Sequence, residues 1–380
     1  MIDPGFEILR LCVRLDDNDR HVSEARTLIS NSQADWDDIF ERAAMHSVRP
    51  QLAMLAGKLE ADLIPAVFRE KISKAYQENQ LRQLRNTGEF FRIRQILVEN
   101  KIRVIPFKGF WIAHEMYGNL ADREAVDVDL FIDLGDLDRV IILMKQNGYL
   151  PEVSDDPGYV SKIKKESAEY NFDMFEGNER LFHFEFHWKI GSSLHDMEIG
   201  IGDLASRIKS ASLQNHDLEV FSPSALLLLS VMHHGGKDTL IQLKQVLDIG
   251  YIIKNSNDID WNWVTFMSGK YHIEKVLYLS ISLAAELTGV EVPQQLRSKV
   301  ETYSIKRLTR NRLKAMSFPP DKWYRNMSDF KELVYHIRTR TGTIFRIRML
   351  FRYIKSLFVQ LLFPGNLVRL YMRKRYRIQA

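Results

Sequence analysis

Two aspartates one residue apart, Asp127 and Asp129, are the side chains in this sequence best suited to chemistry. Apolar residues alternate with them at Val126, Val128 and Leu130, which predicts a strand with an apolar face on a core. The period of two places both carboxylates on the other face. Two like charges there repel, so a fold keeps them mainly when a cation lies between them, and carboxylates with substrate phosphates are typical Mg²⁺ ligands. The alternative is a half-exposed strand with solvated aspartates.

Glu185 is the candidate third carboxylate. It lies in a predicted strand on which His183, Glu185 and His187 share one face. The other face is aromatic, with Phe182, Phe184, Phe186 and Trp188. If its strand lies beside the aspartate strand, Glu185 would complete a metal site or accept a proton from an attacking group of the substrate. If Glu185 lies on the surface, it would do neither. The His-x-Glu-x-His pattern can also bind a transition metal, but the preferred role of His187 is to hydrogen-bond and orient Glu185.

Lys108 and Gly109 are the candidate phosphate-binding residues. They follow the apolar stretch 101–108, a predicted buried strand, and precede a predicted helix over residues 110–117. Free amides at a helix start attract phosphate, a glycine lets a ligand approach the backbone, and Lys108 adds a positive charge. The alternative for Lys108 is a solvated side chain. Arg123, four residues before the first aspartate, would neutralise phosphate or pair with the acids.

Further polar residues follow in the C-terminal half. His233, His234 and Lys237 lie beside a Gly-Gly break in a predicted helix, from which they would touch a nucleotide. A histidine at a helix end is more often structural. Lys244 and Asp248 are spaced i,i+4 on the next helix, so they can also simply pair with each other.

The elements that position these residues follow from periodicity and turn signals. Residues 1–100 are predicted to be helical. The helix over residues 66–99 has an apolar stripe of Leu81, Leu84, Phe91 and Val98. Residues 102–148 are predicted as strand, helix, strand and helix, followed by a mobile loop over residues 149–168. Two strands over residues 169–175 and 180–190 then form a hairpin around Gly177-Asn178. Helices follow from residue 225, with Ser224 as the predicted N-cap.

Composition limits the class of protein. Of the 380 residues 45% are apolar, which is enough for one large domain or two to three smaller ones. The single cysteine excludes an intrachain disulfide and a thiolate zinc site. The sequence has neither a recognisable signal peptide nor a run of 18 apolar residues, so we expect a cytoplasmic location.

The order of these motifs resembles a known family. It comprises Lys108-Gly109, Arg123-x3-Asp127-x-Asp129-Leu130, Gly148-Tyr149, Glu185-x-His187-Trp188, the histidines of the helix over residues 226–236, and residues 243–253 before Asp260-Trp261. An N-terminal Asp35-Trp36…Ala43-x2-His46-x-Val48-x-Pro50 pattern also matches. Together they resemble the uncharacterised bacterial nucleotidyltransferases of the polymerase-beta-like superfamily, over about residues 1–290. Much of that superfamily has Gly-Ser where this chain has Lys108-Gly109.

The resemblance implies an α+β fold: a small mixed-sheet nucleotidyltransferase core over residues 101–220, helical regions over residues 1–100 and 221–330, and a basic tail over residues 331–380. It implies NMP transfer from an NTP to a sugar, small molecule, protein or RNA end, with release of pyrophosphate. The implied cofactor is Mg²⁺, or Mn²⁺. The implied catalytic and metal-binding residues are Asp127, Asp129 and Glu185. The implied nucleotide-binding residues are Lys108, Gly109, Arg123, His187, His234, Lys244 and Asp248. The alternative is a non-catalytic nucleotide-binding or assembly factor on the same fold.

The tail differs in charge from the body. Residues 331–380 hold twelve lysines and arginines and one acid, a net charge of +11, so with +4 for the whole chain residues 1–330 carry −7. Apolar and basic residues alternate over residues 344–377, and Pro364-Gly365 divides them into two predicted helices. The first helix is predicted to pack on the body. The alternative is peripheral contact with an anionic inner-membrane face, a setting where envelope polysaccharides are built.

Overall fold

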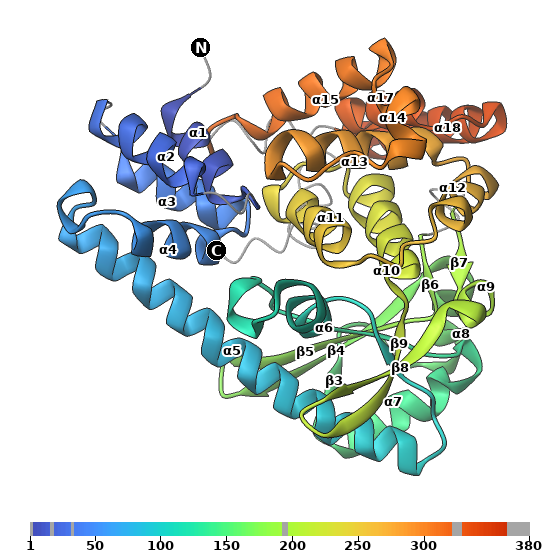
Figure 1. The fold of residues 1–380 in the computed structure, drawn as a ribbon. Helices are drawn as coiled ribbons and strands as arrows, with labels where there is room; N and C mark the ends of the chain where they lie inside the picture. Colours follow the sequence, from blue (N-terminus) through green and yellow to red (C-terminus); the bar gives the residue numbers. More distant parts are fainter. Residues whose placement is uncertain (1–2, 16–18, 32–33, 192–196, 321–328, 363–380) are drawn as a thin grey trace.

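The chain has an α+β fold in which a small mixed sheet is flanked by helical regions (Figure 1). The computed structural model describes residues 3–15, 19–31, 34–191, 197–320 and 329–362. The N-terminal and C-terminal helices lie side by side above the sheet in Figure 1, and the long helix α5 (Ala66–Glu99) runs down beside it. The predicted fold class is therefore confirmed.

Five strands form the central sheet in the order β1-β2-β5-β4-β3. Their bounds are β1 (Ile105–Pro106), β2 (Val128–Phe131), β3 (Leu150–Pro151), β4 (Glu169–Glu176) and β5 (Glu179–His187). Neighbouring strands are antiparallel except β2 and β5, which run parallel and pair Asp129 with Glu185. The predicted hairpin of β4 and β5 is confirmed, and its second strand lies directly against the aspartate strand.

The two faces of this sheet differ in chemistry because side chains alternate along each strand. Leu130, Phe172 and Phe184 are fully buried on the apolar face. Asp129 and its neighbours on β5 lie on the opposite, polar face. The prediction for Val126 was wrong: it is 43% exposed, because the strand begins only at residue 128 and the period of two does not extend back to it.

Helix α5 packs on the core through polar as well as apolar side chains. Its predicted stripe was wrong, since Leu81 and Leu84 are 56% and 50% exposed. The buried side instead includes Asn79, which donates to the carbonyls of Ala121 and Arg123. Gln83 on the same side donates to the Ala125 carbonyl. These bonds satisfy backbone groups of the loop before β2, so the helix holds that loop in place. The remaining N-terminal helices are α1 (Pro4–Cys12), α2 (Arg20–Asn31), α3 (Trp36–Met45) and α4 (Arg49–Lys58).

One predicted loop, and one segment for which no element was predicted, contain regular structure. The predicted mobile loop over residues 149–168 contains α8 (Pro157–Glu166), whose N-cap Asp156 accepts from the amides of the first turn. A second hairpin, β8 (Ile208–Leu213) and β9 (His216–Phe221), was not predicted. Its turn, Gln214-Asn215, has positive φ at both positions without any glycine, so the usual hairpin signal is missing from the sequence. A short pair, β6 (Lys189–Ile190) and β7 (Ile199–Gly200), lies between the sheet and this hairpin along the chain.

The C-terminal helices form one layer above the sheet (Figure 1). They are α10 (Pro223–Ser230), which continues as the π-helix η6 (Val231–Lys237), and α11 (Leu243–Asn255), α12 (Trp261–Lys270), α13 (Glu274–Thr288), α14 (Arg297–Val300), α15 (Tyr303–Met316), α17 (Asp329–Thr339) and α18 (Thr343–Leu362). Ser222, not Ser224, is the N-cap of α10, because Pro223 opens the helix; the Ser224 hydroxyl accepts from the Asp260 amide instead. The second predicted tail helix lies outside the described residues.

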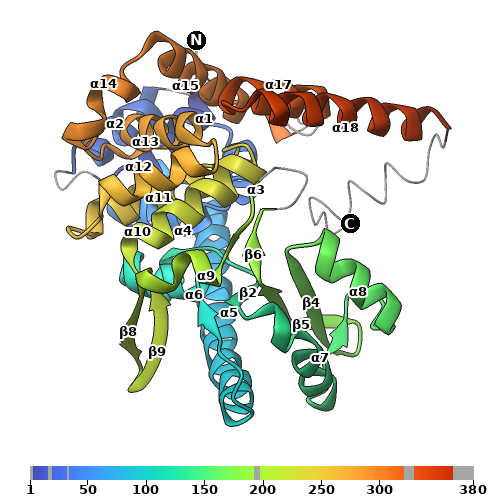
Figure 2. The ribbon, with the colours of Figure 1, turned by 90° about the vertical axis from the view of Figure 1, so that its right-hand side faces the viewer.

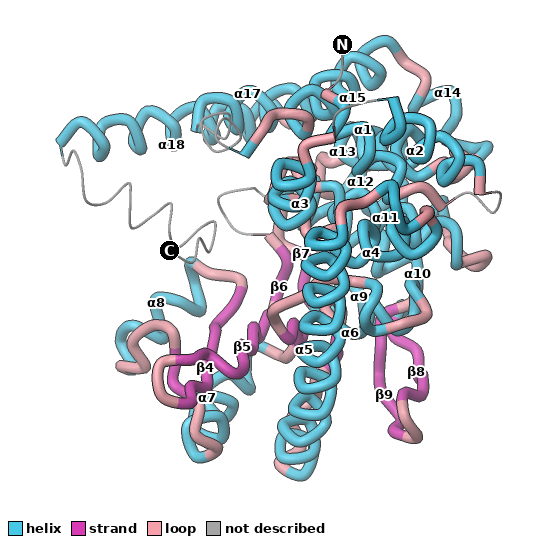
Figure 3. Tube along the Cα trace, turned by 90° about the vertical axis from the view of Figure 1, so that its left-hand side faces the viewer, coloured by secondary structure: helices cyan, strands magenta, loops and turns pink. Residues whose placement is uncertain are grey.

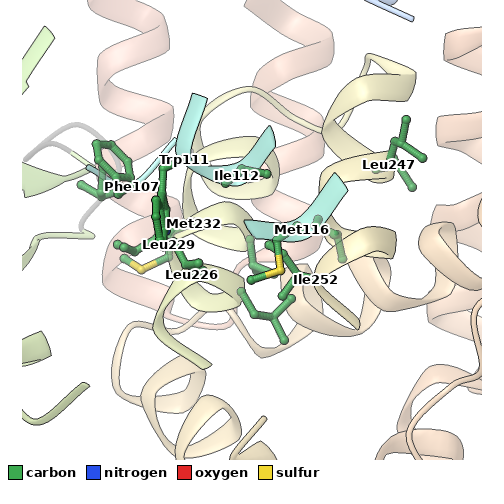
Figure 4. Close-up of a cluster of buried hydrophobic side chains, with 14 of the residues drawn as sticks. Phe107, Trp111, Ile112, Met116, Leu226, Leu229, Met232, Leu247 and Ile252 are labelled. Atoms are coloured by element: carbon green, nitrogen blue, oxygen red, sulfur yellow. The ribbon is translucent and has the colours of Figure 1, made fainter. Parts of the chain in front are cut away.

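A buried apolar cluster joins this helical layer to the region that carries the central sheet (Figure 4). The core contributes Trp111 and Ile112 from α6 (Phe110–Ile112) and Met116 from the π-helix η2 (Ala113–Tyr117). The helical layer contributes Leu226, Leu229, Met232, Leu247 and Ile252. Because these side chains are removed from water together, the two regions are fixed relative to each other.

None of the described helices combines the length and the apolar character that crossing a membrane requires.

His46 connects the N-terminal region to the C-terminal helices. The ring is fully buried, donates from Nε2 to the Met316 carbonyl at 3.2 Å and accepts from the Leu243 amide at Nδ1 at 3.4 Å. Both bonds need the neutral ring with its proton on Nε2. Burial lowers the pKa of His46 from 6.5 to about 3.

We predict that this ring makes stability depend on pH. Between pH 6.5 and 3 the unfolded chain binds a proton that the native ring does not, so stability falls as the pH falls. The loss from His46 alone is roughly 1–2 kcal/mol between pH 6.5 and 5. Urea unfolding across this range should show a flatter pH dependence for His46→Gln, and no change for His216→Gln, which replaces an exposed histidine. Equal slopes for the native chain and His46→Gln would contradict the assignment.

Candidate active site

A turn between β1 and α6 presents Lys108 and Gly109 at the polar face of the sheet. Gly109 has φ of 55° and ψ of −128°, and a Cβ atom there would lie 3.0 Å from the carbonyl oxygen of Asp127. Only glycine adopts this backbone conformation at such a close approach without strain. The predicted strand-to-helix turn is thus formed, although the helix is short and continues as a π-helix ending at Gly118 in the left-handed conformation.

The carboxylates of Asp129 and Glu185 lie side by side because β2 and β5 pair these residues directly. Both are buried. The Lys108 ammonium, also buried, donates to Asp129 Oδ1 at 2.8 Å. Burial alone would raise the pKa of Asp129, but the Lys108 charge and a hydrogen bond from His187 hold that pKa well below its ordinary value. The same attraction raises the pKa of Lys108 against the effect of burial. The site is therefore a desolvated group of charges that needs each of its partners.

His187 lies among three carboxylates on the polar face. Its Nε2 atom is 3.3 Å from Asp129 Oδ1 and 3.4 Å from Glu185 Oε2, and its Nδ1 atom is 3.3 Å from Glu169 Oε2. Burial lowers the pKa of His187, but these hydrogen bonds and the Glu169 charge outweigh it and raise the pKa. Glu169 in turn approaches Lys237 at 3.5 Å. The ring therefore links the paired acids to a second acid and a second lysine.

Glu185 also contacts a second histidine. His183 Nε2 is 3.2 Å from Glu185 Oε1, and His183 Nδ1 is 2.5 Å from Asp173 Oδ1. Glu185 thus lies between two imidazole rings, each of which is held by a carboxylate on β4. This geometry agrees with the predicted shared face of His183, Glu185 and His187.

The helical layer approaches the same lysine through His233 on η6. Lys108 Nζ is 3.2 Å from His233 Nε2, and His233 Nδ1 is 3.0 Å from Asp238 Oδ2. Facing an ammonium group, Nε2 must be the acceptor, so the ring proton is on Nδ1, the nitrogen nearest the Asp238 carboxylate. Burial and the Lys108 charge lower the pKa of His233 to about 4, which keeps the ring neutral. The hydroxyl of Tyr335 on α17 holds this segment by donating to the Gly235 carbonyl at 2.8 Å.

A second buried network lies between the core and α11. Arg123 and Asp248 form a two-bond ion pair, with Nε–Oδ1 and Nη2–Oδ2 distances of 2.8 Å. Asp248 also accepts from the Tyr117 hydroxyl at 2.8 Å and from His234 Nε2 at 3.1 Å. Burial would raise the pKa of Asp248, but Arg123 and His234 hold it far below its ordinary value. Arg123 also donates to the Gly109 carbonyl at 3.3 Å. The network therefore reaches the turn that carries Lys108.

The structure brings the predicted site residues together in two groups. Lys108, Asp129, Glu185 and His187 form the first, and Arg123, His234 and Asp248 form the second. Asp127 lies just outside β2 and is half-buried. Its charge contributes to raising the pKa values of Lys108 and Arg123, so it lies near both groups. Lys244 and Asp248 do not pair with each other. Lys244 donates to the Glu124 carbonyl at 3.2 Å, and Asp248 accepts from Arg123.

Sequence reasoning missed four residues of this site. They are Tyr117, Glu169, Asp173 and Asp238. The three acids each contact a histidine that the sequence analysis did single out, whereas Tyr117 contacts Asp248. A search for acids that could pair with those histidines would therefore have been the available signal.

Two groups of described residues have the side chains to bind a metal ion. In the first, ligand atoms of Asp129, Glu185 and His187 lie within 4.8 Å of one another, and in the second those of His233, His234 and Asp238 do. Two carboxylates and one imidazole fit a divalent cation, with oxygen favouring Mg²⁺ and nitrogen favouring later metals. The second group has two histidines, and the neighbouring lysines Lys108 and Lys237 lower the pKa of His233 by their charge. Lys108 also donates to Asp129 at 2.8 Å, so a cation bound by either group would have to share its site with this ammonium group or displace it.

A cavity of about 280 Å³ lies elsewhere, between the N-terminal helices and α11. Tyr251 is part of its lining, and this ring stacks on Tyr117 of the second network with 3.8 Å between centroids. None of the residues of the first group lines it.

Comparison with known proteins places this chain in a family. The family described as uncharacterised nucleotidyltransferase matches residues 32–289, well over half of the chain. The chain belongs to this nucleotidyltransferase family. Among solved structures, this nucleotidyltransferase is similar to the lincosamide antibiotic adenylyltransferase LnuA in its lincomycin-bound form. The identity is 17%, the TM-score is 0.31, and the match covers 44% of this chain and 97% of LnuA. A comparison with curated proteins finds no match.

We predict that breaking the Arg123–Asp248 pair strongly destabilises the nucleotidyltransferase. Arg123→Met leaves Asp248 buried without its counter-charge, which should cost about 3–5 kcal/mol in urea unfolding. Combining it with Asp248→Asn should cost less than the sum of the two single changes, by about 1 kcal/mol or more. The control is Arg20→Met, in an ion pair with Glu24 on the surface, which should cost less than about 1 kcal/mol. Additive losses would contradict a direct coupling.

Proposed function

We propose that this nucleotidyltransferase moves an NMP group from an NTP to an acceptor and releases pyrophosphate. The observation that carries the proposal is the buried pair Asp129 and Glu185 on adjacent parallel strands, with Lys108 at 2.8 Å from Asp129. Buried like charges side by side are costly, and a fold that only needed stability would do better with apolar residues there. The cost is explained if the acids act on a charged substrate.

Asp129 and Glu185 would hold the divalent cation, with His187 as a further ligand or as the group that orients Glu185. Asp127 would contribute from the more exposed side, since it is half-buried and lies near Lys108. Mg²⁺ suits the oxygen ligands, and Mn²⁺ also accepts the imidazole. When bound, such an ion neutralises charge that develops on the transferred phosphoryl group and on the leaving pyrophosphate.

Lys108 and Gly109 would position the phosphates. Lys108 is held between Asp129 and His233, so its ammonium group points at the same place as the acids. A phosphate that enters beside Asp129 would meet this point charge and the backbone of Gly109. Arg123 would act on this turn through its bond to the Gly109 carbonyl, as a positioning residue. Its partner Asp248, with His234, would keep it there, and Lys244, half-buried near the start of α11, would add a positive charge beside this network.

Glu185 would accept the proton of the attacking acceptor hydroxyl. Its two oxygens lie at 3.2 Å from His183 and 3.4 Å from His187, so both rings fix the orientation of the carboxylate. Glu169 and Asp173 fix the rings in turn. The two histidine rings and their carboxylate partners thus orient Glu185 as a base. The same arrangement would serve any acceptor hydroxyl, so the class of acceptor stays open.

The second candidate is a non-catalytic nucleotide-binding factor on the same fold. It shares the proposed nucleotide site and differs only in turnover. The deciding assay incubates the protein with each α-labelled NTP, Mg²⁺ or Mn²⁺, and cell extract, and follows both transfer of label and release of pyrophosphate. We expect both to occur and to stop with a chelator. NTP binding without transfer to any fraction would favour the binding factor.

Replacing the base tests the role of Glu185. We predict that Glu185→Gln lowers the transfer rate by about 10²–10⁴, because general-base help is lost while the side chain keeps its shape. The matched control is Glu179→Gln, at an exposed position of the same strand, which should keep full activity. A fully active Glu185→Gln protein would return this residue to a structural role.

Replacing the aspartate tests the metal assignment. We predict that Asp129→Asn removes metal-dependent NTP binding in calorimetry, since a neutral amide binds a divalent cation poorly. Asp133→Asn, at an exposed position two residues beyond the end of β2, is the control. Circular dichroism should show both variants folded. Unchanged NTP affinity in folded Asp129→Asn would refute the metal site there.

A further inference from the structure

Helix α18 carries an exposed apolar stripe. Its members are large, lie 47–69% exposed and follow helical spacing: Ile344, Ile347, Leu350, Phe351 and Ile354. At 100° per residue these five positions span about one third of the helix circumference. Ordinary protein surfaces expose apolar residues singly, whereas these five form one continuous stripe.

The opposite side of α18 fixes the helix to the rest of the chain. Phe345 is 2% exposed, and the Arg340 guanidinium lies over its ring at 4.3 Å. Tyr353 contacts Phe330 near the start of α17, with 6.1 Å between ring centroids. Figures 2 and 3 show α17 and α18 together as an arm that extends beyond the other helices. The stripe therefore faces away from the only described helix that α18 packs on closely, α17.

Positive charges border the stripe. Arg348 and Lys355 are exposed at angles next to Ile344, and Arg346 lies beyond the other edge. Residues 343–362 include no acid, and residues 363–380 add five more basic residues and no acid. An apolar stripe with cationic borders matches a surface that offers apolar depth below a layer of negative charge.

We propose that α18 is an interfacial helix that docks on an anionic lipid surface, with its stripe at the acyl boundary and its cations at the headgroups. This docking site goes beyond the transfer reaction and does not depend on it. A second copy of α18 as occupant would place Arg346, Arg348 and Lys355 against their own like charges. Residues 363–380 folding back would do the same with five basic residues. A bilayer with anionic headgroups instead offers opposite charge to Arg348 and Lys355 beside the stripe.

The test is flotation of full-length protein with vesicles of phosphatidylcholine alone or with phosphatidylglycerol. We expect binding only to the anionic vesicles, with release at high salt because the ionic contribution is screened. Each basic residue removed should weaken binding about fivefold. Arg348→Glu with Lys355→Glu should therefore weaken it at least 25-fold, whereas Lys74→Glu with Arg85→Glu on α5, also exposed, should not.

The apolar contribution has its own matched pair. Phe351 and Phe266 are both 69% exposed, on α18 and on α12. Phe351→Ser should weaken vesicle binding at least tenfold, and Phe266→Ser should leave it unchanged. Thermal melting should show that both variants fold. A chain ending at Leu362 should still bind, more weakly, and a chain ending at Gly342 should not.

Three results would overturn the proposal. The first is full-length protein that stays with the buffer in the presence of anionic vesicles. The second is equal binding by Phe351→Ser and Phe266→Ser. The third is a dimer in sedimentation that Phe351→Ser dissociates while vesicle binding is absent, which would make the stripe an interface between copies of the chain.

Discussion

The direct pairing of Asp129 with Glu185 across two parallel strands is the constraint on which the rest of the site depends. Neighbouring strands place these side chains on one buried face, where neither can be solvated and each repels the other. The surrounding residues supply the compensation: Lys108 from the turn after β1, His187 from β5, and Lys237 through Glu169. The site is thus assembled from both the sheet and the helical layer, and neither region could hold these charges alone.

The second network explains how the helical layer keeps its place. Arg123 comes from the loop before β2 and Asp248 from α11, and their two-bond pair is buried at the junction of the two regions. Around it, the apolar cluster of Figure 4 excludes water, which strengthens every polar interaction inside. Because Arg123 also donates to the Gly109 carbonyl, the junction is bonded directly to the turn that carries Lys108.

Much of this architecture was predictable from the sequence, and the exceptions have physical causes. The polar face of β5 follows from strict alternation in residues 182–188 and was predicted correctly. The role of Glu169 was not predictable from the hairpin turn. Continuing the register Phe175–Arg180 would pair Glu169 with Phe186, on the aromatic face. Leu181 is an extra residue in β5, and this bulge moves Glu169 opposite His187.

Helix α5 shows the second kind of exception. Its buried side includes Asn79 and Gln83, which are polar and are buried because loop carbonyls need donors. Hydrophobic periodicity cannot identify such positions, since it treats every polar residue as a surface residue. The Arg123–Asp248 pair is hidden for a related reason: 125 residues separate the two partners, and only the packing of the two regions makes them neighbours.

The hydrogen bond from Tyr335 to the Gly235 carbonyl has a consequence for how the chain can be divided. Gly235 follows His233 and His234 directly, so the penultimate described helix is part of the scaffold that holds those rings. Shortening the chain before residue 329 to obtain a minimal enzyme would leave that carbonyl without its donor and loosen the segment opposite Lys108. Helix α17 is therefore part of the scaffold of the site and not a separable module.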